Sequence, residues 1–397
     1  MRFDRVSTDD GLSQSSVAAI AQDHTGFMWF ATESGLDRYD GFTFRNFRHQ
    51  RGDASSLSGD FARDIDFAAD GSLWIATDGS GVSRWLPATD SFVSWRHDPL
   101  DDASLASDNV RTILTDPRGY VWIGMRDAGL DRLEVATGDI THYSHWPNVS
   151  NSISNNDIYA LALSDDGILW IGTAAGLSRL DTESGHITQY RSAPDDVSSL
   201  PDDWVRSLLV DHEGTLWVGT NAGGLARFDA EAQTFRQFRH LADDYHSISS
   251  DRVETLFEDN EYRLWVGTDN GLNLLHPQTG DFVAYRNDPT DASSLSNDFV
   301  FSIFQDRGGV LWIGTRTEGL NKWNPRSWSF GHYNPADSHG EGLSSPNVTA
   351  FAEDDTGRLW VGTFGGGLNI VDRQNDQIMQ LRNDPNDSAT LSDDRVM

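Results

Sequence analysis

A five-residue stretch of the type Leu-Trp-Ile-Gly-Thr recurs eight times along this chain and constrains its fold more than any other feature. The copies lie 45 to 48 residues apart, and their tryptophans are Trp29, Trp74, Trp122, Trp170, Trp217, Trp265, Trp312 and Trp360. A fixed period of about 40–50 residues with strand-like content is typical of propellers and related repeat folds. The stretch is apolar without alternation, so both faces of the strand are expected to be buried. Gly or Ala follows each Trp at the second position and leaves room for a neighbouring sheet.

The repeat at residues 295–335 contains four strand-like segments. An apolar segment at 299–304 precedes the Trp segment at 311–315, and two more segments lie at 319–323 and 328–333. Turns rich in Asp, Gly and Pro separate these segments. Each repeat is therefore predicted to form a four-stranded antiparallel blade, and the chain to be an all-β propeller.

The turn before each Trp segment is acidic and contains glycine, as at residues 23–26 and 211–214. A calcium loop would need more carboxylates at alternating positions than these turns supply. An Asp that caps a hairpin turn and a Gly at positive φ explain the same residues. His142 and His145 are predicted to lie on one strand and to point to opposite faces, which disfavours joint metal binding. We predict neither a metal site nor a cofactor.

The number of blades is indicated by the apolar residue that anchors each long loop between repeats. Only two of nine anchors, Leu12 and Leu343, are preceded by Gly and followed by Ser. Leu343 comes seven repeats after Leu12, so residues 1–328 are predicted to form a seven-bladed ring. Residues 329–397 would then form the first blade and a truncated second repeat of another ring.

The N-terminal segment 2–6 has the alternation of a fourth strand without the three strands that should precede it. It is predicted to close the seven-bladed ring by pairing with residues 319–323, which would remove an exposed sheet edge. In the alternative, a single eight-bladed ring, it would pair with residues 367–371.

Composition excludes several classes of partner. The 397 residues include 61 acidic and 30 basic ones, which gives a formal net charge of −31. Such a surface repels nucleic acid and anionic lipid, so neither is expected as a general partner. The chain has no cysteine, and no apolar run reaches the roughly 18–20 residues of a membrane span. Residues 393–397 stop within a repeat, so we expect a longer protein whose other parts provide any membrane attachment.

The repeat pattern resembles that of a known family. Residues 109–113 (Asn-Val-Arg-Thr-Ile), 119–124 (Gly-Tyr-Val-Trp-Ile-Gly) and 129–133 (Gly-Leu-Asp-Arg-Leu) are similar to the two-component regulator propeller repeat. The opening at residues 10–17 is similar to first repeats of that family. The resemblance implies a bacterial periplasmic sensor region of two seven-bladed propellers. It also implies a following β-sandwich, a membrane helix and a cytoplasmic histidine kinase or diguanylate cyclase, all outside this chain.

The function implied by the resemblance is signal transduction in response to an oligosaccharide or another small extracellular ligand. A homodimer is left open. The sequence contains no nucleophile elbow, phosphate loop or zinc motif, so no residue is assigned a catalytic role and the chain is predicted not to be an enzyme. The alternative is a protein–protein interaction scaffold. A propeller-fold polysaccharide lyase or glycosidase, which would need a set of acid–base residues in a cleft, is favoured less.

A candidate ligand site emerges when the repeats are aligned on their anchors. Two columns differ from blade to blade, on either side of a column that is uniformly small or branched, and packing does not explain the variation. With the loops after the Trp segments they supply the predicted ligand-binding residues Arg63, Arg111, Arg126, Tyr159, Trp204, Arg206, Phe301 and Arg316. Aromatic platforms and arginines suit an anionic oligosaccharide such as a uronide. In the alternative interpretation, these arginines only offset nearby aspartates around a water-filled channel.

Overall fold

The structure is a computed structural model that describes residues 1–325, 342–372 and 377–397. Within these ranges the chain contains eight four-stranded antiparallel sheets and one short 3₁₀ turn, η1 (Thr8–Asp10), which confirms the predicted all-β propeller class. The chain divides into two compact units, Met1–Arg326 and Ser327–Met397. The strand predicted at 328–333 lies outside the described residues.

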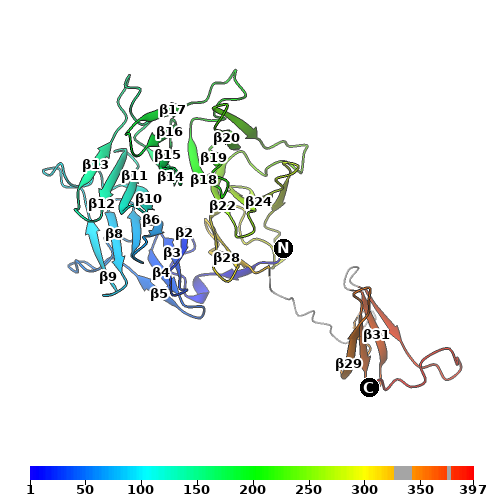
Figure 1. Cartoon of the computed structure of the whole chain (residues 1–397). Coiled ribbons are helices and arrows are strands. Elements are labelled where there is room, and N and C mark those ends of the chain that lie inside the picture. Colours follow the sequence, from blue (N-terminus) through cyan, green and yellow to red (C-terminus); the bar gives the residue numbers. More distant parts are fainter. Residues whose placement is uncertain (326–341, 373–376) are drawn as a thin grey trace. The chain divides into compact units, whose positions relative to one another are not determined.

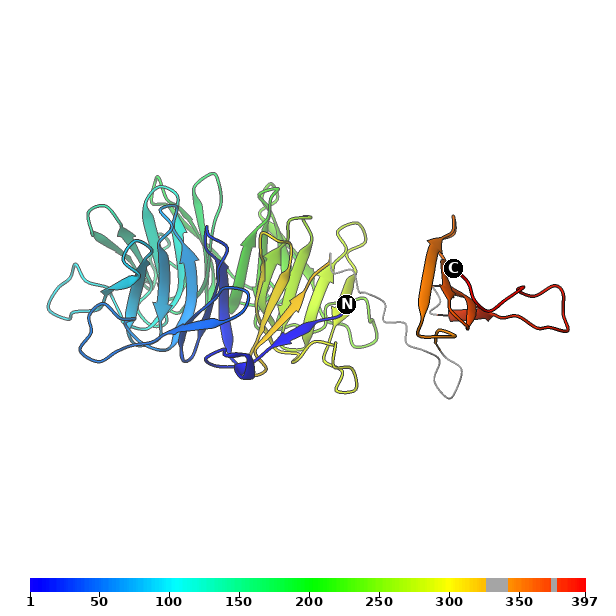
Figure 2. The ribbon, with the colours of Figure 1, turned by 90° about the horizontal axis from the view of Figure 1, so that it is seen from below.

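Seven sheets form the blades of the first unit, which is seen along its axis in Figure 1 and from the side in Figure 2. Each blade runs from an inner strand through a Trp strand, which carries the repeated tryptophan, to a third and a fourth strand. Blade 1 comprises β2 (Val17–Gln22), β3 (Met28–Thr32), β4 (Gly35–Tyr39) and β5 (Phe44–Phe47). Blade 2 comprises β6 (Ala62–Phe67), β7 (Leu73–Thr77), β8 (Gly81–Leu86) and β9 (Ser91–Trp95), and blade 3 comprises β10 (Val110–Asp116), β11 (Tyr120–Met125), β12 (Leu130–Glu134) and β13 (Ile140–Tyr143).

The remaining blades follow the same plan. Blade 4 comprises β14 (Ile158–Leu163), β15 (Ile168–Thr173), β16 (Gly176–Asp181) and β17 (Ile187–Tyr190), and blade 5 comprises β18 (Val205–Val210), β19 (Leu216–Thr220), β20 (Leu225–Asp229) and β21 (Thr234–Phe238). Blade 6 comprises β22 (Val253–Glu258), β23 (Leu264–Thr268), β24 (Gly271–Leu275) and β25 (Phe282–Tyr285), and blade 7 comprises β26 (Val300–Gln305), β27 (Leu311–Thr315), β28 (Leu320–Trp323) and β1 (Asp4–Val6). The sheet of the second unit comprises β29 (Val348–Glu353), β30 (Leu359–Thr363), β31 (Gly367–Asp372) and β32 (Gln377–Leu381).

The ring is closed by strands from the two ends of the first unit. β1 pairs antiparallel with β28, with Asp4 opposite Lys322 and Val6 opposite Leu320. The seven inner strands contact one another in chain order, and the last of them, β26, also contacts the first, β2. The predicted closure is confirmed, although the strand begins at Asp4. The eight-bladed alternative is wrong, because β1 does not join β31.

The small residue of each Trp strand is where successive blades meet. A Cβ atom added at Gly172 of blade 4 would lie 2.7 Å from Val205 Cγ1 of blade 5. The same step joins Gly219 to Val253, and Gly314 of blade 7 to the first inner strand at Val17. The Trp strand of one blade and the inner strand of the next approach this closely because the glycine has no side chain, in agreement with the room for a neighbouring sheet that the sequence predicted.

In six of the eight sheets, the Asp that begins the turn before the Trp strand accepts a hydrogen bond from the indole N–H of that strand's tryptophan. Asp23 Oδ1 accepts hydrogen bonds from the backbone amides of Thr25, Gly26 and Phe27, and Asp23 Oδ2 accepts one from Trp29 Nε1 at 3.0 Å. The same bond between the indole N–H and an Asp six residues earlier occurs for Trp122, Trp217, Trp265, Trp312 and Trp360. These carboxylates cap turns, as predicted.

The two histidines that the sequence placed on one strand are separated by the structure. β13 ends at Tyr143, so His145 lies in the following loop, where its Nδ1 contacts the carbonyl oxygen of the anchor Ile153 at 2.7 Å. His142 remains on β13 and contacts Asp131 Oδ1 at 2.5 Å. The prediction of one shared strand was wrong by two residues, because the anchor carbonyl draws the second imidazole into the loop.

Two half-buried carboxylates of blade 2, Asp64 and Asp66, contact the inner strand of blade 3. Asp64 Oδ2 accepts hydrogen bonds from Thr112 Oγ1 (2.8 Å) and Ile113 N (3.0 Å), and Asp66 Oδ2 accepts them from Thr115. Burial raises the pKa of Asp64 to about 6, although its hydrogen bonds oppose the rise. Burial also raises the pKa of Asp66.

The raised pKa of Asp64 should make stability depend on pH. Between its ordinary pKa of 3.8 and about 6 the folded state holds a proton that the unfolded state releases, so stability falls as pH rises through this range. The fall attributable to Asp64 is up to about 3 kcal/mol. Urea unfolding at pH 4, 5, 6 and 7 should show a flatter dependence for Asp64→Asn than for the wild type. Asp101→Asn, in an exposed loop, should keep the wild-type slope, and an unchanged slope in Asp64→Asn would contradict the assignment.

Candidate ligand site at the inner rim

The predicted site residues lie at the starts of the inner strands and in the loops after the Trp strands. We call these two sets of positions the inner rim. Backbone hydrogen bonds join the two sets within each blade, as from Arg126 N to the carbonyl oxygen of Asn109 (2.9 Å) and from Arg316 N to that of Phe299 (3.1 Å). The inner rim therefore lies on the face of the ring where the long loops between blades enter the inner strands.

A β-bulge explains why one variable column of the sequence is free to vary. In blade 3 the pairing of β10 with β11 steps from Val110 to Thr112 and leaves Arg111 without a partner in the ladder. The same step skips Tyr159 in blade 4 and Arg206 in blade 5. A bulged residue is released from the ladder and its side chain is re-aimed. The residues of this column are therefore not held in the strand pairing of their blade, and their side chains are available for contacts at the inner rim.

Side chains from blades 3, 4 and 5 form one contiguous group. The Arg111 guanidinium lies 3.7 Å from the centre of the Tyr159 ring, and the Tyr159 and Trp204 rings meet edge to face with centroids 5.4 Å apart. The Arg206 guanidinium lies 5.7 Å from both ring centres. The indole N–H of Trp204 is buried without a hydrogen-bond partner.

The group continues through blades 6 and 7. Glu254 Oε2 accepts a hydrogen bond from Arg206 Nη2 at 2.6 Å, and Glu254 Oε1 accepts one from Arg252 Nε at 2.6 Å. The Arg252 guanidinium lies 5.2 Å from the centre of the Phe299 ring. Arg316 lies over the same ring at 5.0 Å, and over that of Phe301 at 5.9 Å. Six of the eight predicted residues thus belong to this contiguous group.

The other two predicted residues stand apart from this group. Arg63 pairs with Asp78 at 2.9 Å and stacks on Phe61, all within blade 2. Arg126 is exposed, and its charge acts on Asp157 without a close ion pair among the described residues.

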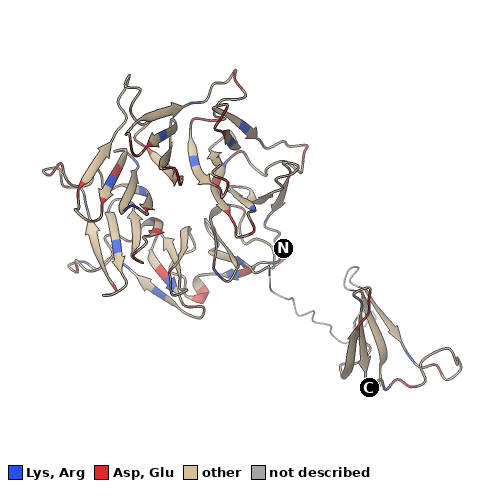
Figure 3. Cartoon of the chain, in the orientation of Figure 1, with Lys and Arg blue, Asp and Glu red and all other residues tan. Residues whose placement is uncertain are grey.

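The arginines of the inner rim are partly neutralised. Arg111 Nη1 lies 2.9 Å from Asp157 Oδ1, without the alignment of a hydrogen bond. Burial raises the pKa of Asp157, while Arg111 opposes the rise. Arg63 and Arg206 are paired as well, which fits the alternative interpretation of these arginines. Of the eight predicted residues, Arg126 and Arg316 are the arginines without an ion pair in the described part of the chain, although acidic residues are spread through the loops around the ring (Figure 3).

Three functional candidates were missed by the sequence reasoning. Arg252, Glu254 and Phe299 belong to the same two columns as the predicted residues, and Glu254 connects two arginines. Their positions in the two variable columns were the available signal, and Glu254 in addition lies at the bulge of its inner strand.

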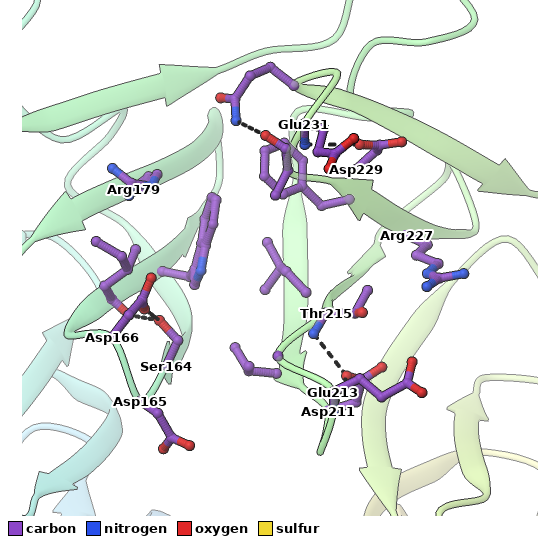
Figure 4. A pocket seen from close by; sticks show the side chains of 18 of the residues that line it. Ser164, Asp165, Asp166, Arg179, Asp211, Glu213, Thr215, Arg227, Asp229 and Glu231 are labelled. Atoms are coloured by element: carbon purple, nitrogen blue, oxygen red, sulfur yellow. Dashed lines mark hydrogen bonds between the residues drawn. The ribbon is translucent and has the colours of Figure 1, made fainter.

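A second feature lies away from the inner rim. A cleft of 1070 Å³ is formed between blades 4 and 5, lined by the turns that precede their Trp strands (Figure 4). No sequence motif had indicated this cleft. Among the described residues, no group of three or more acidic or histidine side chains is placed to hold a metal ion. No helix in the same part of the chain is long and apolar enough to span a membrane.

The comparisons with known proteins agree with the architecture. The two component regulator propeller family matches seven segments, at residues 11–34, 104–127, 152–175, 199–222, 247–270, 294–317 and 342–365. The repeat of blade 2, which has Ala68 where most blades have the capping Asp, is not among them.

The chain is similar to signalling proteins of two bacteria. It is 49% identical over 49 residues to Histidine kinase P4 of Formosa agariphila, a match that covers 12% of this chain and 4% of the kinase. The extracellular domain of a protein described as the hybrid two component system BT3049 of B. thetaiotaomicron is 25% identical, with a TM-score of 0.70. That match covers 97% of this chain and 55% of the solved domain, so the chain spans about half the length of that relative.

The corresponding domain of BT4673 from the same organism shares the fold, with 22% identity, a TM-score of 0.66 and coverage of 96% of this chain and 53% of that domain. Repeated matches along the sequence, the four-stranded blades and the closed ring lead to one assignment. Seven of the eight repeats of this chain are two-component regulator propeller repeats.

Proposed function

We propose that this chain is the periplasmic, non-catalytic sensor part of a bacterial transmembrane signalling protein. The observation that carries the proposal is the similarity of nearly the whole chain to the extracellular domain of a hybrid two-component system. The output would be a cytoplasmic histidine kinase or diguanylate cyclase in a part of the protein beyond this chain. The similarity to a histidine kinase in one repeat favours the kinase.

We further propose that residues 329–397 begin a second ring. In the second unit, a Cβ atom at Gly362 would lie 2.8 Å from Val396 Cγ1, and Val396 N donates to the carbonyl oxygen of Thr363. The same close approach, of a Trp-strand glycine to the first valine of the next inner strand, occurs between Gly172 and Val205 in the first ring. Val396 therefore occupies the position of the first residue of a following inner strand.

The ligand we propose for the inner rim is an anionic oligosaccharide. Arg316 lies over two phenylalanine rings, and the edge-to-face pair Tyr159–Trp204 lies on the same rim. Arg126 and Arg316 are not engaged by carboxylates among the described residues, so they are the guanidinium groups that a uronate could bind. The rings would pack against sugar faces.

Titration calorimetry with trigalacturonate and with maltotriose tests this proposal. The wild type should bind trigalacturonate more tightly, and the double variant Arg126→Ala, Arg316→Ala should lose about tenfold or more in affinity, because each charge-assisted bond contributes about 1.5–3 kcal/mol. The double variant Trp204→Ala, Arg206→Ala should also bind more weakly. Arg2→Ala, an exposed arginine away from the inner rim, is the matched control and should bind like the wild type. Affinity that survives both double variants would place the ligand elsewhere.

A further inference from the structure

The cleft between blades 4 and 5 lies at the opposite end of the strands from the inner rim. One wall carries the turn before β15 with Ser164 and Asp166, and the other carries the turn before β19 with Asp211 and Glu213 (Figure 4). Its volume of 1070 Å³ slightly exceeds the range of about 300–1,000 Å³ that is usual for ligand sites. Nothing in the proposed role of the inner rim depends on it.

Blade 4 departs from its neighbours at one position in this cleft. Where most other blades, including both neighbours, have the Asp that accepts the indole N–H, blade 4 has Ser164, six residues before Trp170. The backbone of the turn is unchanged, because Ser164 N donates to Ile168 O just as Asp23 N donates to Phe27 O. The Ser164 hydroxyl is engaged by Asp166 Oδ1 and Ile168 O. The space that a carboxylate fills elsewhere is therefore left open.

Trp170 consequently directs a donor into the cleft without an acceptor. Its side chain is 6% exposed and lines the cleft, yet its Nε1 makes no hydrogen bond among the described residues. Unlike the indole N–H groups of Trp74 and Trp204, that of Trp170 is not buried away from solvent, so a ligand acceptor in the cleft can reach it.

A second donor on the same wall is also free. Arg179 lies opposite Trp170 in the pairing of β15 with β16. In blades 1, 2, 3 and 5 the equivalent arginine lies over the tryptophan of its own blade, at 5.2–5.8 Å from the ring centre. Arg179 makes no such contact and no ion pair within the described ranges, and it lines the cleft above Asp166 (Figure 4). Two donors therefore face the cleft together.

The other residues that line the cleft indicate which kind of ligand the two donors would bind. Asp166, Glu213 and Glu231 supply acceptors, so a polyanion would be repelled and a ligand must donate as well as accept. Tyr190 and Phe228 supply aromatic surface next to Trp170, with ring centroids 6.0 and 5.2 Å from it. Hydroxyl groups both donate and accept, and the C–H faces of sugars pack on aromatic rings.

We propose that the cleft between blades 4 and 5 is a second binding site, which takes an uncharged saccharide through Trp170 Nε1 and Arg179. Ser164 is the residue that opens it. The site is distinct from the inner rim in both position and preferred charge.

The test restores the residue that the other blades have. Ser164→Asp should accept the Trp170 N–H, fill the open space and lower the affinity for a neutral saccharide by about tenfold or more. Calorimetry with maltotriose, cellotriose and xylotriose, each up to about 10 mM, covers the affinities expected of such a site. Arg179→Gln should weaken binding of the same saccharide severalfold, and thermal unfolding checks that each variant is folded.

The matched control is Ala68→Asp in blade 2. Ala68 is also six residues before its tryptophan, and the Trp74 indole N–H also lacks a partner, but Trp74 is fully buried and does not line this cleft. This variant should bind the saccharide within about twofold of the wild type. The inner-rim variants should leave maltotriose binding at the cleft unchanged, whereas Ser164→Asp should leave trigalacturonate binding unchanged. Failure of the wild type to bind any of the three neutral probes, or equal binding by Ser164→Asp, would overturn the proposal.

Discussion

Replacing Trp265 with alanine should lower the free energy of unfolding of the first unit by about 3–5 kcal/mol. Trp265 is fully buried, with the rings of Tyr285 and Trp323 at 6.3 and 5.8 Å between centroids. Its indole N–H donates to Asp259 Oδ2 at 2.8 Å, so the substitution also leaves a buried carboxylate oxygen without this donor. The loss of stability has two causes: a cavity between blades 6 and 7, and the loss of the hydrogen bond between the indole and the turn. Urea denaturation followed by circular dichroism measures it.

Trp146→Ala is the matched control for this change. Trp146 is 64% exposed in a loop, so its replacement should change the free energy of unfolding by no more than about 0.5 kcal/mol. Equal unfolding midpoints for the two variants would show that the Trp strand is not the buried element of the blade.

Removing residues 1–6 should lower the free energy of unfolding by about 3–6 kcal/mol, because it removes two buried apolar side chains whose burial contributes about 1.5–3 kcal/mol each. Phe3 and Val6 are 5% and 6% exposed in the closed ring. The truncation also leaves β28 as an exposed edge with unpaired backbone groups, so the shortened chain should associate with itself. Urea denaturation and size-exclusion chromatography measure the two effects.

A chain that lacks only Met1 and Arg2 distinguishes the loss of β1 from a general effect of truncation. Both residues are exposed and precede β1, so this variant should unfold and elute like the wild type. If the longer truncation behaved in the same way, β1 would not be the strand that stabilises the closed ring.

Much of the ring could be predicted because its determinants are local and repeated. The period of the tryptophans gave the blades, and the recurrence of Gly-Leu-Ser at Leu12 and Leu343 gave their number in the first ring. The turn role of Asp23 followed from residue type and spacing alone. The end of β13 could not be placed to within two residues, because His145 contacts the backbone of Ile153 within the loop that follows the strand, and residue type does not reveal that contact.

The candidate sites were only partly predictable, because they depend on contacts between blades. The column of Arg206 could be found, but its pairing with Glu254, 48 residues away, depends on the bulge and on how the side chains reach across to the next blade. The cleft at Trp170 arises from an exception rather than a pattern. Ser164 is an ordinary turn residue, and its significance emerges only when the missing acceptor is compared with the equivalent Asp in other blades.

The pairing of β1 with β28 also sets the order in which the molecule can be completed. Because β1 precedes the other strands of the ring in the chain, it must wait for almost the entire ring to be made before its hydrogen-bonding partner exists. Until then the N-terminal residues are unpaired and the inner strand of blade 1 lacks its neighbour from blade 7. Contacts so distant in sequence are formed slowly, and the waiting edges are open to wrong partners. The ring is thus closed by a late event, and its unpaired strand edges need protection until the last blade is made.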